Sequence, residues 1–212
     1  MKKKIFWLSI TINFVLIFLI LSLSYRYREE LCQEWIVRNH SAEIVMFGDS
    51  HTEGGKWNFL LNTHPVLRLG RGGFTTNRLV QLIPLSIESK PKYVFILCGG
   101  NDIYENCFSV ENTIGNFKLM ANTLKSNHII PVFQKLMYQH NNPSFNVSID
   151  AINRRLEDYC SKENIPLLDI GKSMYDSTGL KKNFTRDNLH LNEEGYKIWS
   201  ETVNVFLKNQ KK

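Results

Sequence analysis

Residues Glu43–Gly55 read E-I-V-M-F-G-D-S-H-T-E-G-G, and this stretch decides how the rest of the chain is interpreted. Its first half, Ile44–Phe47, is an unbroken apolar run of the kind found in a strand buried on both faces. Gly48, Asp49 and Ser50 follow directly and predict a tight turn into a helix. Such a turn places the serine hydroxyl beside free backbone N–H groups, which suits a nucleophile that attacks a carbonyl. A turn in which the carboxylate or the hydroxyl only caps the helix fits these three residues equally well.

Length and composition predict one globular domain with an appendage. The chain has 212 residues, of which 43% are hydrophobic and 22% are charged. Half of its formal net charge of +6 comes from Lys2, Lys3 and Lys4, and more lysines lie at the extreme C-terminus. Because the positive charge is concentrated at the two ends, we expect no nucleic-acid-binding surface.

Residues 5–23 form an uncharged, mostly apolar segment directly after the three lysines. As a helix it would be about 28 Å long, close to the thickness of a membrane's hydrocarbon core. Two interpretations are open for residues 1–24. A retained membrane anchor is favoured because the run exceeds the roughly 7–15 residues of a signal-peptide core. A cleaved signal peptide is permitted by the small residues Ser22 and Ser24.

The basic residues around this segment predict its orientation. Three lysines precede it, and Arg26 and Arg28 follow it, so we expect the N-terminus inside the cell. Residues 25–41 would then form a charged connector outside the cytoplasm. Residues 42–212 would form an extracytoplasmic domain, secreted if the segment is cleaved.

From residue 43 onward, apolar strand-like runs alternate with helix-patterned segments. The runs cover residues 44–47, 66–69, 93–98, 128–133 and 165–170. The helical segments cover residues 77–88, 109–125, 146–163 and 193–207. This alternation predicts a three-layer α/β/α sandwich with a five-stranded parallel sheet of flavodoxin-like type. In such sheets ligands bind beyond the carboxyl ends of the strands, and every motif considered below follows such an end.

Two glycine-rich turns follow the second and third strand-like runs. The first, Gly70–Thr76, reads G-R-G-G-F-T-T, and it lacks the glycine spacing of a phosphate-binding loop. The second, Cys98–Asp102, reads C-G-G-N-D. Its Asn101 suits a left-handed turn, and it also offers an amide N–H₂ donor at the same edge of the sheet as Ser50.

Asp187 and His190 stand three residues apart, just before a helix that Asn192 is predicted to cap. This spacing allows the carboxylate to hold one imidazole nitrogen while the other faces outward. His51 follows Ser50 directly and is badly placed to act as its base, so it either lines the site or faces solvent. The four cysteines are scattered, and no Cys/His cluster predicts a metal site.

Four blocks in this order, G-D-S-H-T, G-R-G-G-F-T-T, G-G-N-D and D-N-L-H, resemble the GDSL-type esterases of the SGNH hydrolase superfamily. The likeness runs from the first strand-like run to the last helical segment. It implies that Ser50 is the nucleophile, His190 its base and Asp187 the group that orients the base. It also implies an oxyanion hole formed by the Ser50 N–H with Gly73 and Asn101, and it implies no metal or other cofactor.

The chain departs from the family pattern at three places. His51 stands where an aliphatic residue is usual, Phe74 where aspartate is common, and residues 68–70 read Arg-Leu-Gly instead of Asn-Arg-Gly. The catalytic set is intact, whereas substrate preference is left open.

The resemblance predicts a serine esterase that hydrolyses short-chain or acetyl esters through an acyl-enzyme intermediate. The expected extracytoplasmic location favours glycans or lipids of the cell envelope as its substrates. Two alternatives remain: an O-acyltransferase to envelope polysaccharide that uses the same site, and a glycan-binding module without activity.

Overall fold

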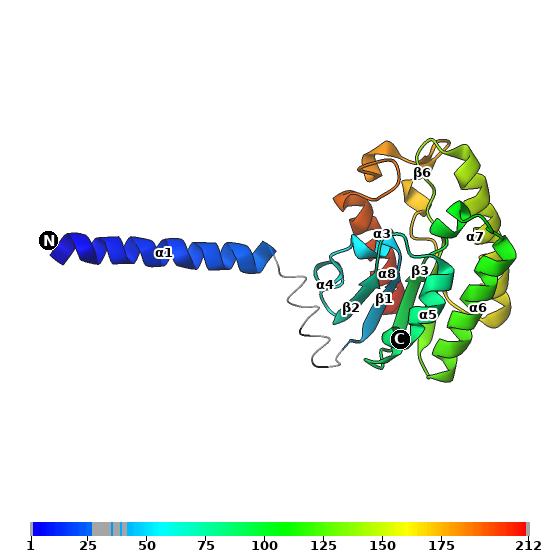
Figure 1. The fold of residues 1–212 in the computed structure, drawn as a ribbon, viewed down its shortest axis with the longest axis horizontal. Coiled ribbons are helices and arrows are strands. Elements are labelled where there is room, and N and C mark those ends of the chain that lie inside the picture. Colours follow the sequence, from blue (N-terminus) through cyan, green and yellow to red (C-terminus); the bar gives the residue numbers. More distant parts are fainter. Residues whose placement is uncertain (1, 27–34, 36–38, 40–41, 211–212) are drawn as a thin grey trace.

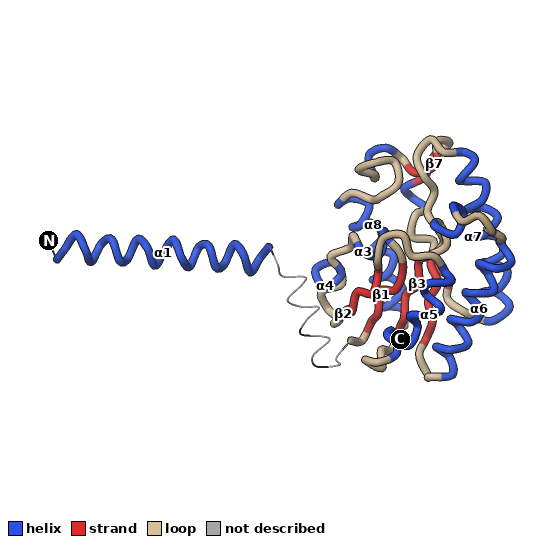
Figure 2. The backbone as a smooth tube through the Cα atoms, viewed as in Figure 1, coloured by secondary structure: helices blue, strands red, loops and turns tan. Residues whose placement is uncertain are grey.

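The computed structural model describes residues 2–26, 35, 39 and 42–210. Its centre is a sheet of five parallel strands in the order β2-β1-β3-β4-β5 (Figures 1 and 2). The strands are β1 (Ile44–Gly48), β2 (Val66–Gly70), β3 (Tyr93–Leu97), β4 (Ile130–Gln134) and β5 (Leu167–Leu168). The predicted α/β fold with a five-stranded parallel sheet is therefore confirmed.

Helices cover both faces of the sheet and complete the three layers. One face carries α5 (Thr76–Ile87), α6 (Val110–Ser126) and α7 (Pro143–Glu163), and the other carries α4 (Trp57–Leu60) and α8 (Glu193–Asn209). Along β1, Val45 and Phe47 pack toward the first group, while Ile44 and Met46 pack toward the second. Because β1 is buried on both sides, its sequence is an unbroken apolar run.

The last two strands begin later than the sequence pattern predicts. His128 has a φ of 60° and lies in a turn, so β4 starts two residues further on, at Ile130. β5 is limited to Leu167–Leu168, where it pairs with the end of β4. The chain from β5 to α8 instead forms short elements that the sequence did not predict. These are η2 (Lys172–Met174), a two-stranded hairpin of β6 (Tyr175–Asp176) and β7 (Gly179–Leu180), and η3 (Lys182–Phe184).

Near the N-terminus, α1 spans Lys2–Arg26 and includes the predicted membrane segment, residues 5–23. Within the described part of the chain, no helix meets the length and hydropathy that a membrane crossing requires. A helix at this position is thus confirmed, while its spanning of a membrane is not supported. The predicted connector, residues 25–41, lies largely outside the described residues. Of the four cysteines, Cys98, Cys107 and Cys160 are free, and Cys32 lies outside the described residues.

Candidate active site

The turn after β1 places Ser50 at the start of the short helix α3 (Ser50–Glu53). Asp49 caps this helix, because its Oδ1 accepts a hydrogen bond from the backbone N–H of His51 at 3.0 Å. Gly48 is needed at the end of the strand, since a Cβ there would lie 2.2 Å from the carbonyl oxygen of Leu97. The capping interpretation is therefore correct for Asp49. It leaves the Ser50 hydroxyl free for another partner.

That partner is His190, which lies 140 positions further along the chain. Its Nε2 is 2.9 Å from Ser50 Oγ, and its Nδ1 is 2.8 Å from Asp187 Oδ2. Burial alone would raise the pKa of Asp187. Hydrogen bonds from the His190 side chain and from the backbone N–H groups of His190 and Leu189 outweigh burial and lower this pKa to about 2. The aspartate is therefore ionised at neutral pH and can stabilise a protonated imidazole.

Local hydrogen bonds shape the loop that carries Asp187 and His190. The carbonyl oxygen of His190 accepts from the backbone N–H of Arg186 at 3.0 Å and from Thr185 Oγ1 at 2.9 Å. Immediately afterwards Asn192 caps α8, as the sequence predicts, with its Oδ1 accepting from the N–H of Gly195 at 3.1 Å. The helix cap and the loop thus fix the direction in which the imidazole leaves the chain.

The glycine-rich turn after β2 supplies backbone N–H groups next to Ser50. Gly72 donates its N–H to Glu53 Oε2 at 2.7 Å, so that group is already used. Gly73 has a φ of 77°, and no acceptor for its N–H or for that of Ser50 is found among the described residues. These two N–H groups are available to an oxyanion.

Asn101 begins the short helix η1 (Asn101–Tyr104) at the end of β3. Its Nδ2 donates to the carbonyl oxygen of Phe74 at 2.9 Å, which fixes the amide and leaves its second hydrogen free. The neighbouring Asp102 is buried and accepts from the backbone N–H of Thr76 at 2.9 Å and from Thr113 Oγ1 at 3.2 Å. This carboxylate connects the two predicted glycine turns and holds them in register.

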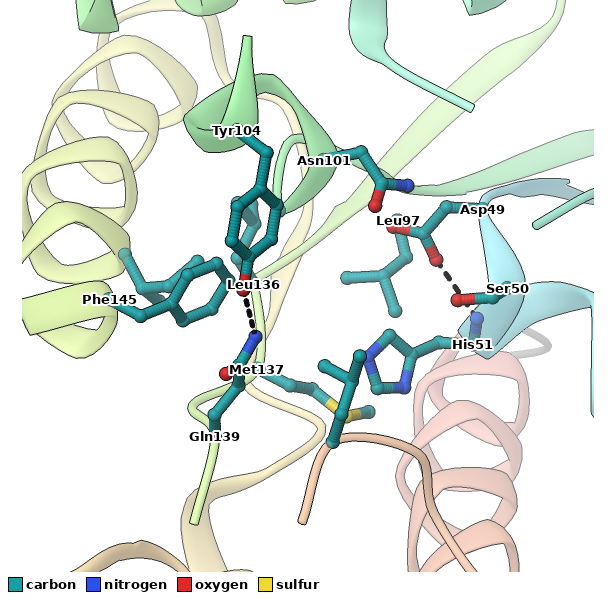
Figure 3. Close-up of a pocket in the computed structure, with 13 residues that line it drawn as sticks. Asp49, Ser50, His51, Leu97, Asn101, Tyr104, Leu136, Met137, Gln139 and Phe145 are labelled. Carbon is teal, nitrogen blue, oxygen red and sulfur yellow. Dashed lines mark hydrogen bonds between the residues drawn. The ribbon is translucent and has the colours of Figure 1, made fainter. Parts of the chain in front are cut away.

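A pocket opens beside Ser50 and extends toward α7 (Figure 3). Its cavity volume is about 30 Å³. Apolar side chains from four segments form most of its wall: Leu97, Leu136, Met137, Phe145, Ile149 and Leu189. At the far side Tyr104 stacks on Phe145 with ring centres 5.4 Å apart, and its hydroxyl accepts from Gln139 Nε2 at 2.9 Å. Sequence reasoning missed these wall residues, because the contacts that bring them together join segments far apart in the chain.

Asp49 and His51 flank the nucleophile, and both are buried. Burial raises the pKa of Asp49 to about 7 and lowers the pKa of His51 to about 4. The solvent-facing alternative for His51 is therefore wrong, since its side chain points into the pocket (Figure 3). Within the described part of the chain, no group of three or more His, Cys, Asp or Glu residues is placed to hold a metal ion.

A serine, a histidine and an aspartate joined by hydrogen bonds at one edge of a parallel sheet form the arrangement of a serine hydrolase. The chain belongs to the GDSL-like lipase/acylhydrolase family, whose sequence profile matches residues 46–198. This membership confirms the resemblance carried by the four sequence blocks.

Solved structures with the same fold include two proteins from Bacteroides. A Bacteroides fragilis protein assigned as an acylhydrolase is 26% identical, with a TM-score of 0.72, over 80% of this chain and 88% of that one. A GDSL-like lipase from Bacteroides thetaiotaomicron is 22% identical, with a TM-score of 0.73, over 84% of this chain and 98% of that one. The second likeness, at this identity, supports the fold alone.

Curated relatives include N-acylneuraminate cytidylyltransferases of Streptococcus agalactiae. The serotype III protein is 27% identical over 170 residues, which make up 80% of this chain and 40% of the relative. The chain therefore spans less than half of that protein. The activity named for the whole relative does not carry over to this chain.

Proposed function

We propose that this protein is a serine esterase that hydrolyses short acyl esters through an acyl-enzyme intermediate formed on Ser50. The observation that supports this most is the 2.9 Å separation between His190 Nε2 and Ser50 Oγ, with Asp187 on the other imidazole nitrogen. This is the contact that a general base needs with its nucleophile.

In the first half of the reaction, Ser50 Oγ attacks the ester carbonyl and His190 Nε2 accepts its proton. Asp187 holds the opposite nitrogen and stabilises the imidazolium that forms. The negative oxygen of the tetrahedral intermediate receives hydrogen bonds from the N–H groups of Ser50 and Gly73 and from the free hydrogen of Asn101. His190 then donates the proton to the alcohol oxygen as the C–O bond breaks.

In the second half, water attacks the carbonyl carbon of the acyl-enzyme. His190 accepts a proton from the water and returns it to Ser50 Oγ as the acid leaves. Hydrolysis and transfer to a sugar hydroxyl differ only in the molecule that enters at this step, so the same residues would also serve the acyltransferase alternative.

The pocket supports a small acyl group. A cavity of about 30 Å³ beside Ser50 has room for an acetyl methyl or a similar group, while a long chain would require its apolar wall to move. Acetyl esters of envelope glycans therefore head the candidate substrates, and lipid esters follow. Because the curated relatives are named for N-acylneuraminate, an O-acetylated sialic acid belongs among the glycans tested.

An ester panel tests this proposal. The full-length chain, wild type beside Ser50→Ala, is offered p-nitrophenyl acetate, butyrate and octanoate, together with acetylated sugars. We expect acetate to be hydrolysed fastest and the variant to be inactive, although it unfolds at the same temperature as the wild type. Equal turnover by the two proteins would refute the assignment of Ser50. A glycan acceptor included in the assay separates hydrolysis from transfer, since transfer would yield more acylated glycan than free acid.

For location, we propose that α1 anchors the domain to a membrane with the catalytic part outside the cytoplasm. Apolar side chains of α1 are exposed along most of its described length, including Trp7, residues 14–21 and Leu23. Large exposed apolar surfaces of this kind favour contact with lipid or another apolar partner. Recovery of the intact chain in the aqueous fraction after cell lysis would contradict the anchor.

A further inference from the structure

His51 carries a buried polar atom that has no partner. The residue follows Ser50 on α3 and is only 8% exposed. Its Nδ1 is shielded from solvent and makes no hydrogen bond within the described structure. Buried polar atoms are nearly always paired, because leaving one unpaired destabilises the fold. The position is therefore not explained by packing alone.

The unpaired nitrogen also determines which tautomer the ring adopts. Burial and the neighbouring His190 keep the pKa of His51 near 4, so the ring is neutral at pH 7 and has one N–H. A buried N–H without an acceptor is rarer than a buried lone pair without a donor. We therefore place the proton on Nε2 and the lone pair on the shielded Nδ1.

Nε2 is the ring nitrogen farther from the backbone, and the ring reaches from α3 into the pocket (Figure 3). The ring centres of His51 and His190 are 5.5 Å apart. In the proposed reaction His190 donates its proton to the leaving alcohol oxygen, so the alcohol must lie against His190. Groups on the carbon next to that oxygen then come within reach of His51.

We propose that His51 is a substrate-binding residue whose Nε2–H donates a hydrogen bond to an uncharged oxygen on the alcohol part of the ester. The inference rests on the proposed esterase function and specifies its substrate class: acyl esters of polyols and sugars with a hydroxyl next to the acylated oxygen. The preference also gives a role to a histidine at a position where the family usually has an aliphatic residue.

A matched pair of substrates isolates this contact. Cyclohexyl acetate and the monoacetate of trans-1,2-cyclohexanediol differ only by the neighbouring hydroxyl. The full-length wild type is expected to show a higher kcat/KM for the diol ester, by about two- to tenfold, as one neutral hydrogen bond allows. His51→Leu should bring this ratio to about one. His51→Gln, which retains an N–H donor at a similar distance from the backbone, should keep most of it.

The ratio separates binding from a merely structural role, since a disturbed site would slow both esters alike. A ratio in His51→Leu equal to that of the wild type would overturn the inference, as would equal rates of the wild type on the two esters. A third result would also overturn it: the wild type prefers cyclohexyl glycolate to cyclohexyl acetate but shows no preference for the diol ester. The contact would then lie on the acyl group. Failure of the esterase proposal looks different: the wild type would hydrolyse neither ester, and the inference would fall with it.

Discussion

The two sides of the candidate site are built in different ways. The nucleophile side follows a strand of the core, and the residues around Ser50 are almost fully buried, with Asp49 5% and Thr52 0% exposed. The acid–base side is a surface loop, in which the side chain of His190 is 22% exposed and that of Asp187 47% exposed. Core packing positions the first side, and short-range hydrogen bonds position the second.

This difference teaches where a substitution will act. A change on the buried side alters packing or desolvation, so it should affect stability as well as turnover. A change in the loop removes a reacting or orienting group but little buried surface, so it should affect turnover alone. Substitutions on the two sides should therefore be measured for both properties.

The largest expected effect is on the loop side. His190→Ala removes the base and should lower kcat/KM by about 10⁴-fold, with a change in unfolding free energy of about 0.5 kcal/mol or less. Steady-state kinetics and urea denaturation measure the two quantities. His128→Asn changes a histidine in the turn before β4, at the opposite end of the sheet. It is the matched control and should stay fully active. If His190→Ala lowered the unfolding free energy by several kcal/mol, the loop side would also be needed for stability, and the proposed difference between the two sides would be wrong.

Next in size is the oxyanion donor at the end of β3. Asn101→Ala removes a side-chain donor and should lower kcat by about 10²–10³-fold with little change in KM, because the contact forms only in the transition state. The substitution also removes the hydrogen bond to the carbonyl oxygen of Phe74, so some loss of stability is expected. If KM rose while kcat held, Asn101 would be a ground-state contact instead.

Much of the loop side could be predicted from sequence, because its signals are local. Asp187 and His190 are three residues apart, and Asn192 caps the next helix, so their geometry depends on a few neighbouring bonds. The alternation of apolar runs likewise predicts the sheet. The predicted membrane crossing by α1 is not supported by the described residues.

The pocket could not be predicted in the same way. Its wall joins η1, the chain after β4, and α7, and Gln139 meets Tyr104 across 35 positions. The orientation of His51 depends on the packing of α3 against α8, where Tyr196 Oη donates to the carbonyl oxygen of His51 at 2.8 Å. Contacts of this range leave no periodicity in the sequence. The hydrogen bond from the Gly72 N–H to Glu53 could not be predicted either, because it depends on the fold placing Glu53 opposite that turn.

On the buried side, Asp49→Asn should change stability in a pH-dependent way. Burial raises the pKa of Asp49 to about 7 from the ordinary carboxyl value of 3.8, so between these two pH values the folded state holds a proton that the unfolded state has released. This contribution to stability is complete below about pH 4 and is lost as the pH rises through 7. The asparagine keeps an oxygen acceptor for the His51 N–H but never ionises.

The variant should therefore gain stability relative to the wild type between pH 4.5 and pH 8, by a few kcal/mol at most. Urea denaturation of both proteins at the two pH values measures the difference. The lowered pKa of His51 has the opposite effect, since it reduces stability as the pH falls toward 4. Both proteins contain His51, so this contribution cancels in the difference between them. A difference that stays constant with pH would mean that Asp49 is ionised at little cost in the folded protein.

The smallest expected effect concerns Glu53, which lies at the surface where the buried nucleophile side meets solvent. Glu53 is exposed, yet its Oε2 accepts the N–H of Gly72, and a Cβ on Gly72 would lie only 3.8 Å from Ser50 Cβ. The carboxylate thus holds the turn in the conformation that leaves the Gly73 N–H free. Glu53→Ala should lower kcat by about tenfold without changing KM, as expected when an oxyanion donor is less well oriented.

Glu53→Gln is the informative partner to that variant. It removes the charge but keeps an oxygen acceptor, so it should recover most of the lost kcat if the hydrogen bond to Gly72 is what matters. Glu88→Ala, which removes an exposed glutamate at the end of α5, controls for the loss of negative charge and should behave as the wild type. If glutamine proves as slow as alanine, the charge of Glu53 and not its hydrogen bond supports the site. The nucleophile side would then depend on surface electrostatics as well as on the core.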